Sequence, residues 1–384
     1  EKKQEAITKK FEELFSQINF EIDLQNPLRR LSTLSYNCIY GTDANPRMAR
    51  TAKMNMIMHG DGHGGVHHHD GLLNVNGIFD NRYDIILTNP PFGARVEKSL
   101  VVSPLDIPND EEIKYYTEKY KEYDYLVNVV NPIKEWANYD NGKGKGKPII
   151  DLFEVGKRSG LTEVLFIERC LNLLKPGGRM GIVLPEGVLN TSSLQSVRDF
   201  VEGRAKILNI TSIPQDVFIA SGATVKPSLL FLKKFTDEET EQYNAIKEKG
   251  NIELDKKYLP QLEVLHNEYI AKTKEQKKTD KKEYFEAIKR IERQRQDDLK
   301  QIIKEKFDYE IAIVEVEKAG ITSTGAECYN ELIDVAKEFK QYAREKNLWK
   351  HLESYVQYDE INGEMKRTRV INNVVSEPEP IYVK

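Results

Sequence analysis

Residues 83–92 read Tyr83-Asp84-Ile85-Ile86-Leu87-Thr88-Asn89-Pro90-Pro91-Phe92. The first six are rich in β-forming side chains and too few for a typical helix, so they predict a buried strand. The two prolines cannot continue a β-ladder, because proline has no N–H to donate. The sequence therefore leaves Asn89 at the carboxyl end of a strand, which is the edge of an open α/β sheet where ligands bind.

The four residues from Asn89 to Phe92 suit a flat base that carries an amino group. The Asn89 amide oxygen and the Pro90 carbonyl can both accept a hydrogen bond from an exocyclic amine. The Phe92 ring can stack on the base, and Pro91 completes the motif. The other interpretation is a strand that ends in an ordinary polar turn.

Two further short runs end in an acidic residue. Residues 38–43 form a β-type run that ends at Asp43, and residues 66–69 form another that precedes Asp70. Residues 48–59 between the two runs predict a helix. This βαβ order predicts a parallel sheet with both acids at its ligand-binding edge. An acid placed like Asp43 commonly accepts hydrogen bonds from the ribose of a nucleoside cofactor. An acid placed like Asp70 can accept a hydrogen bond from the adenine amine of the same cofactor.

Five motifs follow one another in this part of the chain: Tyr40-Gly41-Thr42-Asp43-Ala44-Asn45-Pro46, Ala52-Lys53-Met54-Asn55-Met56, His59-Gly60-Asp61-Gly62, Asp70-Gly71-Leu72-Leu73 and Asn89-Pro90-Pro91-Phe92-Gly93. In this order they closely resemble the modification (M) subunit of type I restriction-modification systems, which are adenine-specific DNA methyltransferases. Residues 173–179 and 183–189 look like the fifth-strand region of that family. The resemblance is good over residues 36–235 and looser elsewhere.

The resemblance implies a fold and a cofactor. The fold is α/β, with the Rossmann-like sheet of an S-adenosylmethionine-dependent methyltransferase and a helical C-terminal region. Asp43, with Ala44 beside it, would hold the ribose of S-adenosylmethionine. Asp70 would face the cofactor adenine, with Leu72 or Leu73 against the ring, and Asn89 would also lie at the cofactor.

The resemblance also implies how the target is methylated. Asn89 and the Pro90 carbonyl would accept from the amine of the target adenine, and Phe92 would stack on that base after it flips out of the duplex. The amine nitrogen attacks the sulfonium methyl directly, so alignment of the two supplies much of the rate. The three cysteines lie in no Pro-Cys dipeptide, so a cytosine-carbon methyltransferase with a cysteine nucleophile is not expected.

The chain departs from this family in one respect. Related methyltransferases carry a Gly-rich cofactor loop after the first strand, but residues 1–37 contain no glycine and predict a charged amphipathic helix. We therefore expect the chain to begin after that loop and to lack the first strand of the sheet. Because this strand lies near the centre of the family's sheet, we expect a gap with unpaired strand edges.

Composition is that of a globular protein with much charged surface. The chain has 384 residues, of which 39% are hydrophobic, and its net charge is −4. Two to three domains are expected at this length. No apolar run approaches the ~20 residues of a membrane span, and no N-terminal signal region is present, so we expect a cytoplasmic protein without membrane contact. This negative net charge is not typical of a protein that binds DNA alone, but it is compatible with a subunit that recognises DNA through a partner.

Three parts are predicted along the chain. Residues 1–35 form a helical lead-in, residues 36–235 the catalytic domain with an insertion at about 94–159, and residues 236–384 a mostly helical region for subunit or DNA contact. Residues 271–306 hold 13 Lys/Arg against 8 Asp/Glu. This stretch predicts a long helix that packs on its neighbours, docks a specificity subunit, or passes close to DNA phosphates.

We therefore predict a DNA adenine methyltransferase subunit of a restriction-modification system. Its expected partners are double-stranded DNA, a specificity subunit and, in a larger complex, a restriction subunit. Two alternatives stay open: an RNA or protein-glutamine methyltransferase with the same Asn89–Phe92 site, and a truncated scaffold subunit without catalysis. No metal is expected, because three consecutive histidines at 67–69 alternate faces on a strand and cannot converge on one ion.

Overall fold

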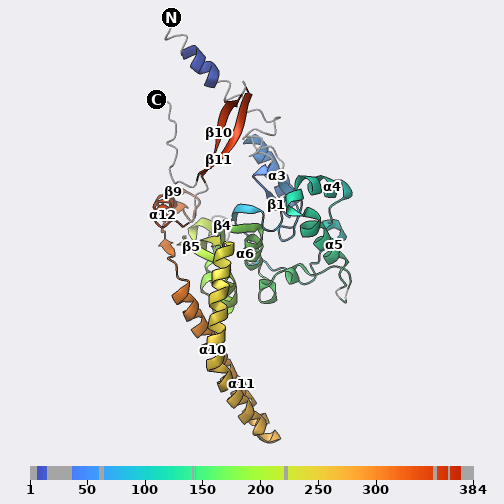
Figure 1. The fold of residues 1–384 in the computed structure, drawn as a ribbon, viewed down its shortest axis with the longest axis vertical. Coiled ribbons are helices and arrows are strands. Elements are labelled where there is room, and N and C mark those ends of the chain that lie inside the picture. The colour runs from blue at the N-terminus through green and yellow to red at the C-terminus, as the bar shows by residue number, and fades with distance from the viewer. Residues whose placement is uncertain are drawn as a thin grey trace. The chain divides into compact units, whose positions relative to one another are not determined.

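The computed structural model describes residues 7–14, 37–59, 65–140, 142, 144–219, 224–348, 353–361 and 364–372. They fall into two compact units, and Figure 1 labels some of their elements. The larger unit joins Glu1–Ser212 to Val225–Ile313, and the smaller joins Ile213–Thr224 to Val314–Lys384. The predicted site lies wholly in the larger unit.

The predicted βαβ unit is present. β1 (Gly41–Asp43) and β2 (Val66–His68) pair in parallel, and α3 (Pro46–Met58) connects them. The helix begins after Asn45, whose Oδ1 accepts from the backbone N–H of Arg47 at 2.9 Å and so satisfies a donor that has no partner within the helix. The prediction of two parallel strands joined by a helix is therefore confirmed.

A second sheet has the strand order β3-β4-β6-β5-β7. Its strands are β3 (Tyr83–Thr88), β4 (Leu174–Pro185), β5 (Ala205–Ser212), β6 (Pro227–Lys234) and β7 (Ala312–Glu315). β3 runs parallel to β4, whereas β6 is antiparallel to both β4 and β5. Parallel and antiparallel strands with a helical connection confirm the α/β class.

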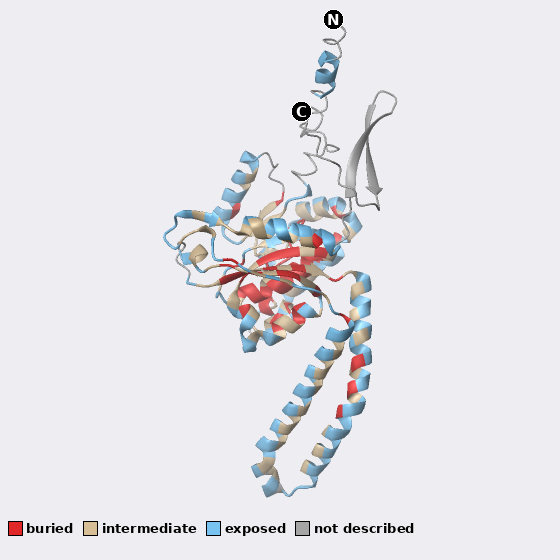
Figure 2. Cartoon of the chain, turned by 90° about the vertical axis from the view of Figure 1, so that its left-hand side faces the viewer, coloured by how far each residue is buried: buried red, intermediate tan, exposed pale blue. Residues whose placement is uncertain are grey.

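Helix α6 (Thr162–Leu173) carries much of the core of the larger unit. Its apolar side chains belong to the same buried cluster as those of β4, and Leu165 and Leu171 are at most 1% exposed. Figure 2 shows these buried residues gathered on the sheet and the helices around it. After β4 come α7 (Glu186–Asn190), the 3-10 turn η6 (Ser192–Leu194) and α8 (Gln195–Glu202).

The chain between β3 and α6 is mostly helical. It contains η1 (Pro104–Asp106), α4 (Asp110–Lys119), η2 (Lys121–Tyr123), η3 (Leu126–Val130), α5 (Asn131–Asn138), η4 (Ile149–Leu152) and η5 (Val155–Lys157). Val129, Val130 and Ile133 are fully buried and belong to the main core. The insertion predicted at about 94–159 is therefore packed into the larger unit.

The two sheets are separated at the open edge of β3. A cavity of about 220 Å³ lies between them and is lined by residues of β1, β3 and α6. Ile85 and Leu87 are 56% and 77% exposed, because they share one face of β3 while Ile86 on the other face packs on the core. Residues 83–88 form a strand as predicted, but the prediction that this strand is buried is wrong. Among the described residues, the expected gap in the sheet is present.

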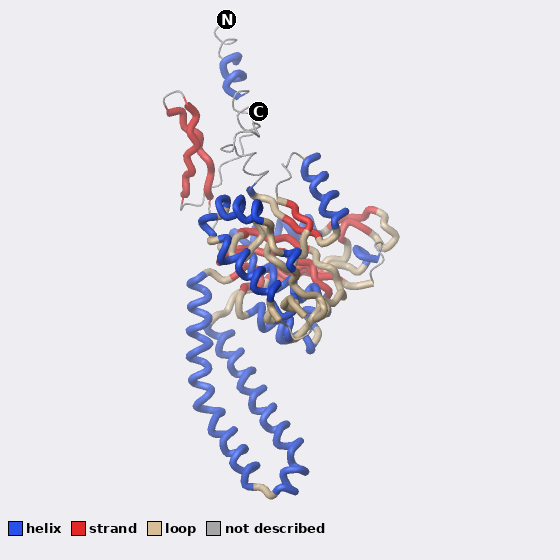
Figure 3. The backbone as a smooth tube through the Cα atoms, turned by 90° about the vertical axis from the view of Figure 1, so that its right-hand side faces the viewer, coloured by secondary structure: helices blue, strands red, loops and turns tan. Residues whose placement is uncertain are grey.

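Two long helices, α10 (Asp237–Ala271) and α11 (Lys274–Lys306), lie side by side and are joined by a short turn (Figure 3). Tyr258 and Lys257 both donate to Asp298 Oδ2 at 2.7 Å, and these bonds tie one helix to the other. The long helix predicted within residues 271–306 is confirmed as α11, and α10 precedes it.

The smaller unit contains α9 (Asp216–Ile219), β8 (Ala319–Ile321), β9 (Glu327–Asn330), α12 (Leu332–Glu345), β10 (Glu353–Ile361) and β11 (Glu364–Asn372). β8 pairs antiparallel with β9, and β10 with β11. Of the predicted lead-in, residues 7–14 are helical, and the rest of residues 1–36 lies outside the described residues. No helix among the described residues is both long enough and apolar enough to cross a membrane.

Candidate active site

The motif from Asn89 to Phe92 directly follows β3, as predicted. Pro90 is buried and Phe92 is half-buried, whereas Asn89 and Pro91 are exposed. The buried proline fixes the backbone at the strand end, because its φ angle is locked by the ring. The Asn89 amide therefore stands at the sheet edge where a ligand can reach it.

Three polar residues follow the ends of parallel strands: Asp43, Asp70 and Asn89. Their chain neighbours Thr42, Gly71 and Thr88 all line the cavity between the two sheets. The structure thus brings to one cavity the three segments that the sequence placed at the ligand-binding edge. Gly71 is tightly enclosed, since an added Cβ would lie 3.1 Å from the Phe166 ring and 3.3 Å from Thr42 Oγ1.

One carboxylate oxygen of Asp43 and one of Asp70 accept a hydrogen bond from a backbone N–H. Asp43 Oδ1 accepts from the N–H of Asn45 at 2.7 Å, and Asp70 Oδ1 accepts from the N–H of Leu72 at 2.9 Å. Ala44 is exposed, and its carbonyl lies 3.1 Å from His68 Nε2. The two backbone bonds hold one oxygen of each carboxylate in place near the end of its strand.

The leucines after Asp70 are part of the hydrophobic core. Leu72 is 5% exposed and Leu73 is 1% exposed. Neither side chain therefore presents more than a small surface to a ligand, and the contact with the cofactor adenine stays a prediction.

Glu163, on α6, holds the chain just after the Asn89–Phe92 motif. Both oxygens of its carboxylate accept from the N–H of Gly93 at 3.2 Å, and the residue is 3% exposed. Next to it, the carbonyl of Ala94 accepts from the N–H of Thr162 at 2.9 Å and from its Oγ1 at 3.1 Å. Sequence reasoning missed this anchor, although an acid within an apolar helix is a signal for a buried polar contact.

Arg169, also on α6, holds the segment after Asp70. Its guanidinium donates to the carbonyls of Gly71 at 3.0 Å and Leu73 at 2.7 Å, and to Asn74 Oδ1 at 2.6 Å. Burial lowers the pKa of Arg169, while Asp80 at 3.1 Å opposes that shift. Two charged residues of one helix therefore position the two segments that carry the predicted cofactor and target contacts.

The histidines of β2 have structural partners. Burial is the main cause that lowers the pKa of His67 to about 4, and Lys53 contributes. His67 Nδ1 is 3.1 Å from the amide of Asn76. Within the described ranges, no group of three or more His, Cys, Asp or Glu side chains is arranged to hold a metal ion.

A mixed α/β sheet with an Asn-Pro-Pro-Phe motif after one strand, beside a parallel strand pair that leads into two acids, has the class of a Rossmann-like methyltransferase. The family model described as N-6 DNA methylase matches residues 29–136 and 129–310. The chain belongs to the N-6 DNA methylase family.

Similar proteins cover only parts of the chain. It is 23% identical over 157 residues to "Defense against restriction protein B" of Escherichia phage P1, which is 40% of this chain and 6% of the phage protein. A putative class I S-adenosylmethionine-dependent methyltransferase from Listeria monocytogenes is 19% identical over 52% of this chain and 45% of that one, with a TM-score of 0.33. The modification subunit of a putative type I restriction enzyme from Vibrio vulnificus YJ016 is 20% identical over 54% and 35%, with a TM-score of 0.37. The chain spans less than half the length of each.

S-adenosylmethionine is the cofactor that membership in the N-6 DNA methylase family implies for this chain. The residues present fit that cofactor at the strand ends. Asp43 and Asp70 supply carboxylate acceptors for hydroxyl and amino groups, and the enclosed Gly71 keeps β1 and α6 close beside them. When bound, S-adenosylmethionine supplies an electrophilic methyl group.

Proposed function

We propose that the chain is the modification subunit of a type I restriction-modification system and methylates the exocyclic amine of a flipped adenine in DNA. The observation that supports this most is the Asn89–Phe92 motif at the carboxyl end of β3, next to the cavity that the Asp43 and Asp70 segments share. Membership in the N-6 DNA methylase family supports the same reaction.

In this proposal each residue of the motif acts on the target base. Asn89 Oδ1 and the Pro90 carbonyl accept from the two amine protons, which favours the tetrahedral geometry that nitrogen adopts as it attacks a methyl group. The ring of Phe92 stacks on the base, and Pro91 stiffens the loop that carries all three. Glu163 acts through Gly93 as a positioning residue.

We further propose that a sequence-specificity subunit binds this chain and that a restriction subunit joins the complex. The predicted division into lead-in, catalytic domain and C-terminal region belongs to this proposal. Helix α10 offers a surface for such a partner, because several of its large apolar side chains are more than half exposed: Ile252, Leu259, Val264 and Ile270.

One observation favours a second candidate function, a scaffold subunit without catalysis. Among the described residues no strand pairs with the edge of β3 that faces β1, and Leu87 is 77% exposed beside the cavity. A cofactor pocket with an open wall binds its ligand weakly, because less of the ligand is removed from water.

Calorimetric titration of S-adenosylmethionine into the purified chain, followed by a methyl-transfer assay, tests the proposal. We expect binding that Asp43→Ala abolishes, and transfer of labelled methyl groups to plasmid DNA as N6-methyladenine. Transfer to ribosomal RNA or to protein glutamine instead of DNA would replace the proposed substrate. A folded chain that binds no cofactor would leave the scaffold function as the better explanation.

Removing the anchor of the motif should slow methyl transfer without unfolding the chain. In Glu163→Ala, Gly93 loses its acceptor and the loop can shift, so we expect kcat to fall about 10- to 100-fold. Glu163→Gln keeps an acceptor oxygen in the same place and should retain most of the rate. Single-turnover methyl transfer measures both variants, and an unchanged rate in Glu163→Ala would contradict the positioning role.

A further inference from the structure

The proposed cofactor contacts and the proposed target-base contacts follow strands of two different sheets. Asp43 and Asp70 follow the strands of the β1–β2 pair, whereas Asn89 follows β3 of the five-stranded sheet. Among the described residues, no β-ladder joins the two sheets. The distance from a methyl donor at the first sheet to an amine at the second therefore depends on side chains that span the space between the sheets.

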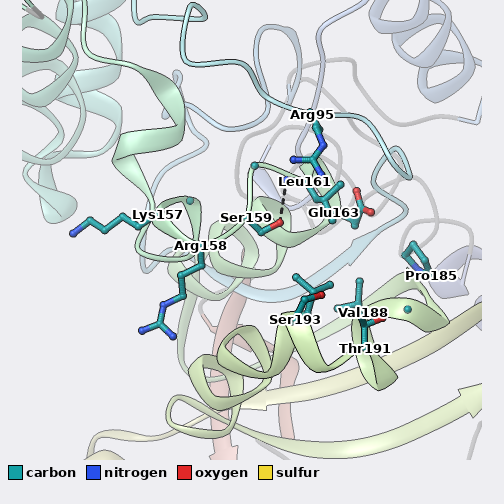
Figure 4. Close-up of a pocket in the computed structure, with 14 residues that line it drawn as sticks. Arg95, Lys157, Arg158, Ser159, Leu161, Glu163, Pro185, Val188, Thr191 and Ser193 are labelled. Carbon is teal, nitrogen blue, oxygen red and sulfur yellow. Dashed lines mark hydrogen bonds between the residues drawn. The ribbon is translucent and has the colours of Figure 1, made fainter. Parts of the chain in front are cut away.

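The loop that carries the target-base motif is fixed to the five-stranded sheet and its helix α6. Gly93, directly after the motif, donates to the Glu163 carboxylate at 3.2 Å, and a β-bridge joins Arg95 to Leu161. Figure 4 shows Arg95, Leu161 and Glu163 together at one wall of a second cavity, of about 500 Å³. These contacts place Asn89 relative to α6, but they do not include β1.

Arg82 reaches from the five-stranded sheet to the residue before β1. Its backbone N–H donates to the carbonyl of Leu173 at 2.9 Å, which fixes Arg82 beside the start of β4. Its guanidinium carbon lies 4.1 Å from the ring centre of Tyr40, which directly precedes β1, and 5.2 Å from that of Tyr83, which begins β3. The ring of Tyr120, at the end of α4, lies 4.5 Å from the same carbon. One cation therefore contacts the starts of both strands and the insertion.

The rings around Arg82 are held by hydrogen bonds and close packing. Arg82 and the Tyr83 hydroxyl both donate to the carbonyl of Gly77. The hydroxyls of Tyr40 and Tyr120 lie 3.2 Å apart, at hydrogen-bond distance. Gly77 leaves no room for a side chain, since an added Cβ would lie 2.8 Å from the Tyr40 ring and 2.9 Å from the Arg82 guanidinium. Because the ring faces also attract the guanidinium electrostatically, the cluster resists displacement of β1 relative to β3.

We infer that Arg82 is a positioning residue for methyl transfer: it holds β1, and with it Asp43, at the distance from Asn89 that the reaction needs. The inference rests on the proposed function. Arg82 lies at the amino end of β3 and Asn89 at its carboxyl end, about 20 Å away at ~3.3 Å per residue. A small rotation at the cluster therefore becomes a larger shift at the site, where a misplacement of about 1 Å can cost a factor of 10² in rate.

The first test separates alignment from binding. Arg82→Met keeps the length of the side chain and removes its charge and donors. We expect kcat for DNA to fall about 10- to 100-fold. The affinity for S-adenosylmethionine should change little, because Asp43 and Asp70 both belong to the β1–β2 pair. The calorimetric stoichiometry, which reports the folded fraction, should equal that of the wild type. Arg82→Lys keeps a cation among the rings and should recover part of the rate.

The second test measures the separation of the two sheets without substrate or cofactor. Spin labels are placed at Met54→Cys on α3 and Ser192→Cys on η6, which are both exposed. The accessible cysteines, Cys38 and Cys328, are changed to serine in the same chain. We expect Arg82→Met to broaden the distribution of distances between the labels.

Arg204→Met is the matched control. The Arg204 guanidinium carbon lies 3.8 Å from the ring centre of Phe200, so the change removes a similar contact, but one that joins α8 to the start of β5. Its kcat and its distance distribution should be those of the wild type. Should Arg82→Met fail to fold, Arg82→Lys decides in the same way.

An unchanged distance distribution in the Arg82 variant overturns the inference, whether or not kcat falls. A fall in kcat that matches the fall in calorimetric stoichiometry also overturns it, since the loss then comes from unfolded chain. If the wild-type chain methylates no DNA, the proposed function fails. A broadened distribution in Arg82→Met then still supports the role of Arg82 in holding β1.

Discussion

Asn89→Ala is expected to lower the rate of methyl transfer by about 10²- to 10³-fold, the loss that follows when one hydrogen bond that strengthens in the transition state is removed. As the amine nitrogen attacks, positive charge grows on it and its two protons become more acidic. An acceptor on those protons therefore stabilises the transition state more than the ground state. Alanine at this position leaves the Pro90 carbonyl as the remaining acceptor.

The fold should survive this change. Asn89 is exposed at the sheet edge, and exposed substitutions usually alter stability by less than about 0.5 kcal/mol. Single-turnover transfer of a labelled methyl group to DNA gives the rate, and calorimetry gives the affinity for S-adenosylmethionine, which we expect to change far less. Asn138→Ala, an exposed asparagine at the end of α5, is the matched control. Wild-type methylation by Asn89→Ala would show that the motif is not the catalytic site.

Local patterns in the sequence predicted the elements that hold the site. Residues 83–88 and the two short runs before Asp43 and Asp70 are stretches whose β-forming side chains and flanking turns fix their type. The helix predicted within residues 271–306 begins after a turn that no glycine or proline marks. Its signal is the capping box, in which Thr273 accepts from the N–H of Gln276 and the Gln276 side chain accepts from the N–H of Thr273.

The exposure of β3 and the anchors on α6 depend on residues that are distant in the chain. Whether Leu87 is buried is decided by what covers its face of the sheet, and an apolar run cannot show that. Glu163 reaches Gly93 across 70 residues, and Arg169 reaches Leu73 across 96. Sequence composition marks such residues as unusual within an apolar helix, but only the packed structure shows which segment each one holds.

Arg169→Ala is expected to destabilise the larger unit by about 3–5 kcal/mol, the cost of removing one partner from a buried charged network. The side chain of Arg169 is 5% exposed, and alanine would leave the carbonyls of Gly71 and Leu73 without their donor while opening a cavity beside them. Urea unfolding measures the loss as a lower midpoint with an unchanged m value. Arg204→Ala is the control, because the side chains of Arg204 and its partner Glu154 are 43% and 53% exposed, and loss of such an ion pair should cost less than about 1 kcal/mol.

Substitution of Arg169 should also loosen the segment after Asp70, in addition to lowering the stability of the larger unit. Leu72 donates to Asp70 Oδ1 and Leu73 donates to the Asp70 carbonyl, so hydrogen exchange at these two amides reports on the segment that Arg169 holds. We expect both amides to exchange faster in Arg169→Lys, because a lysine ammonium cannot reproduce the planar fork that bonds to several acceptors at once. Faster exchange there, with the amides of β4 still protected, would show that Arg169 positions the Asp70 segment and does more than fill the core. Equal loss of protection throughout the larger unit would leave Arg169 with a role in stability alone.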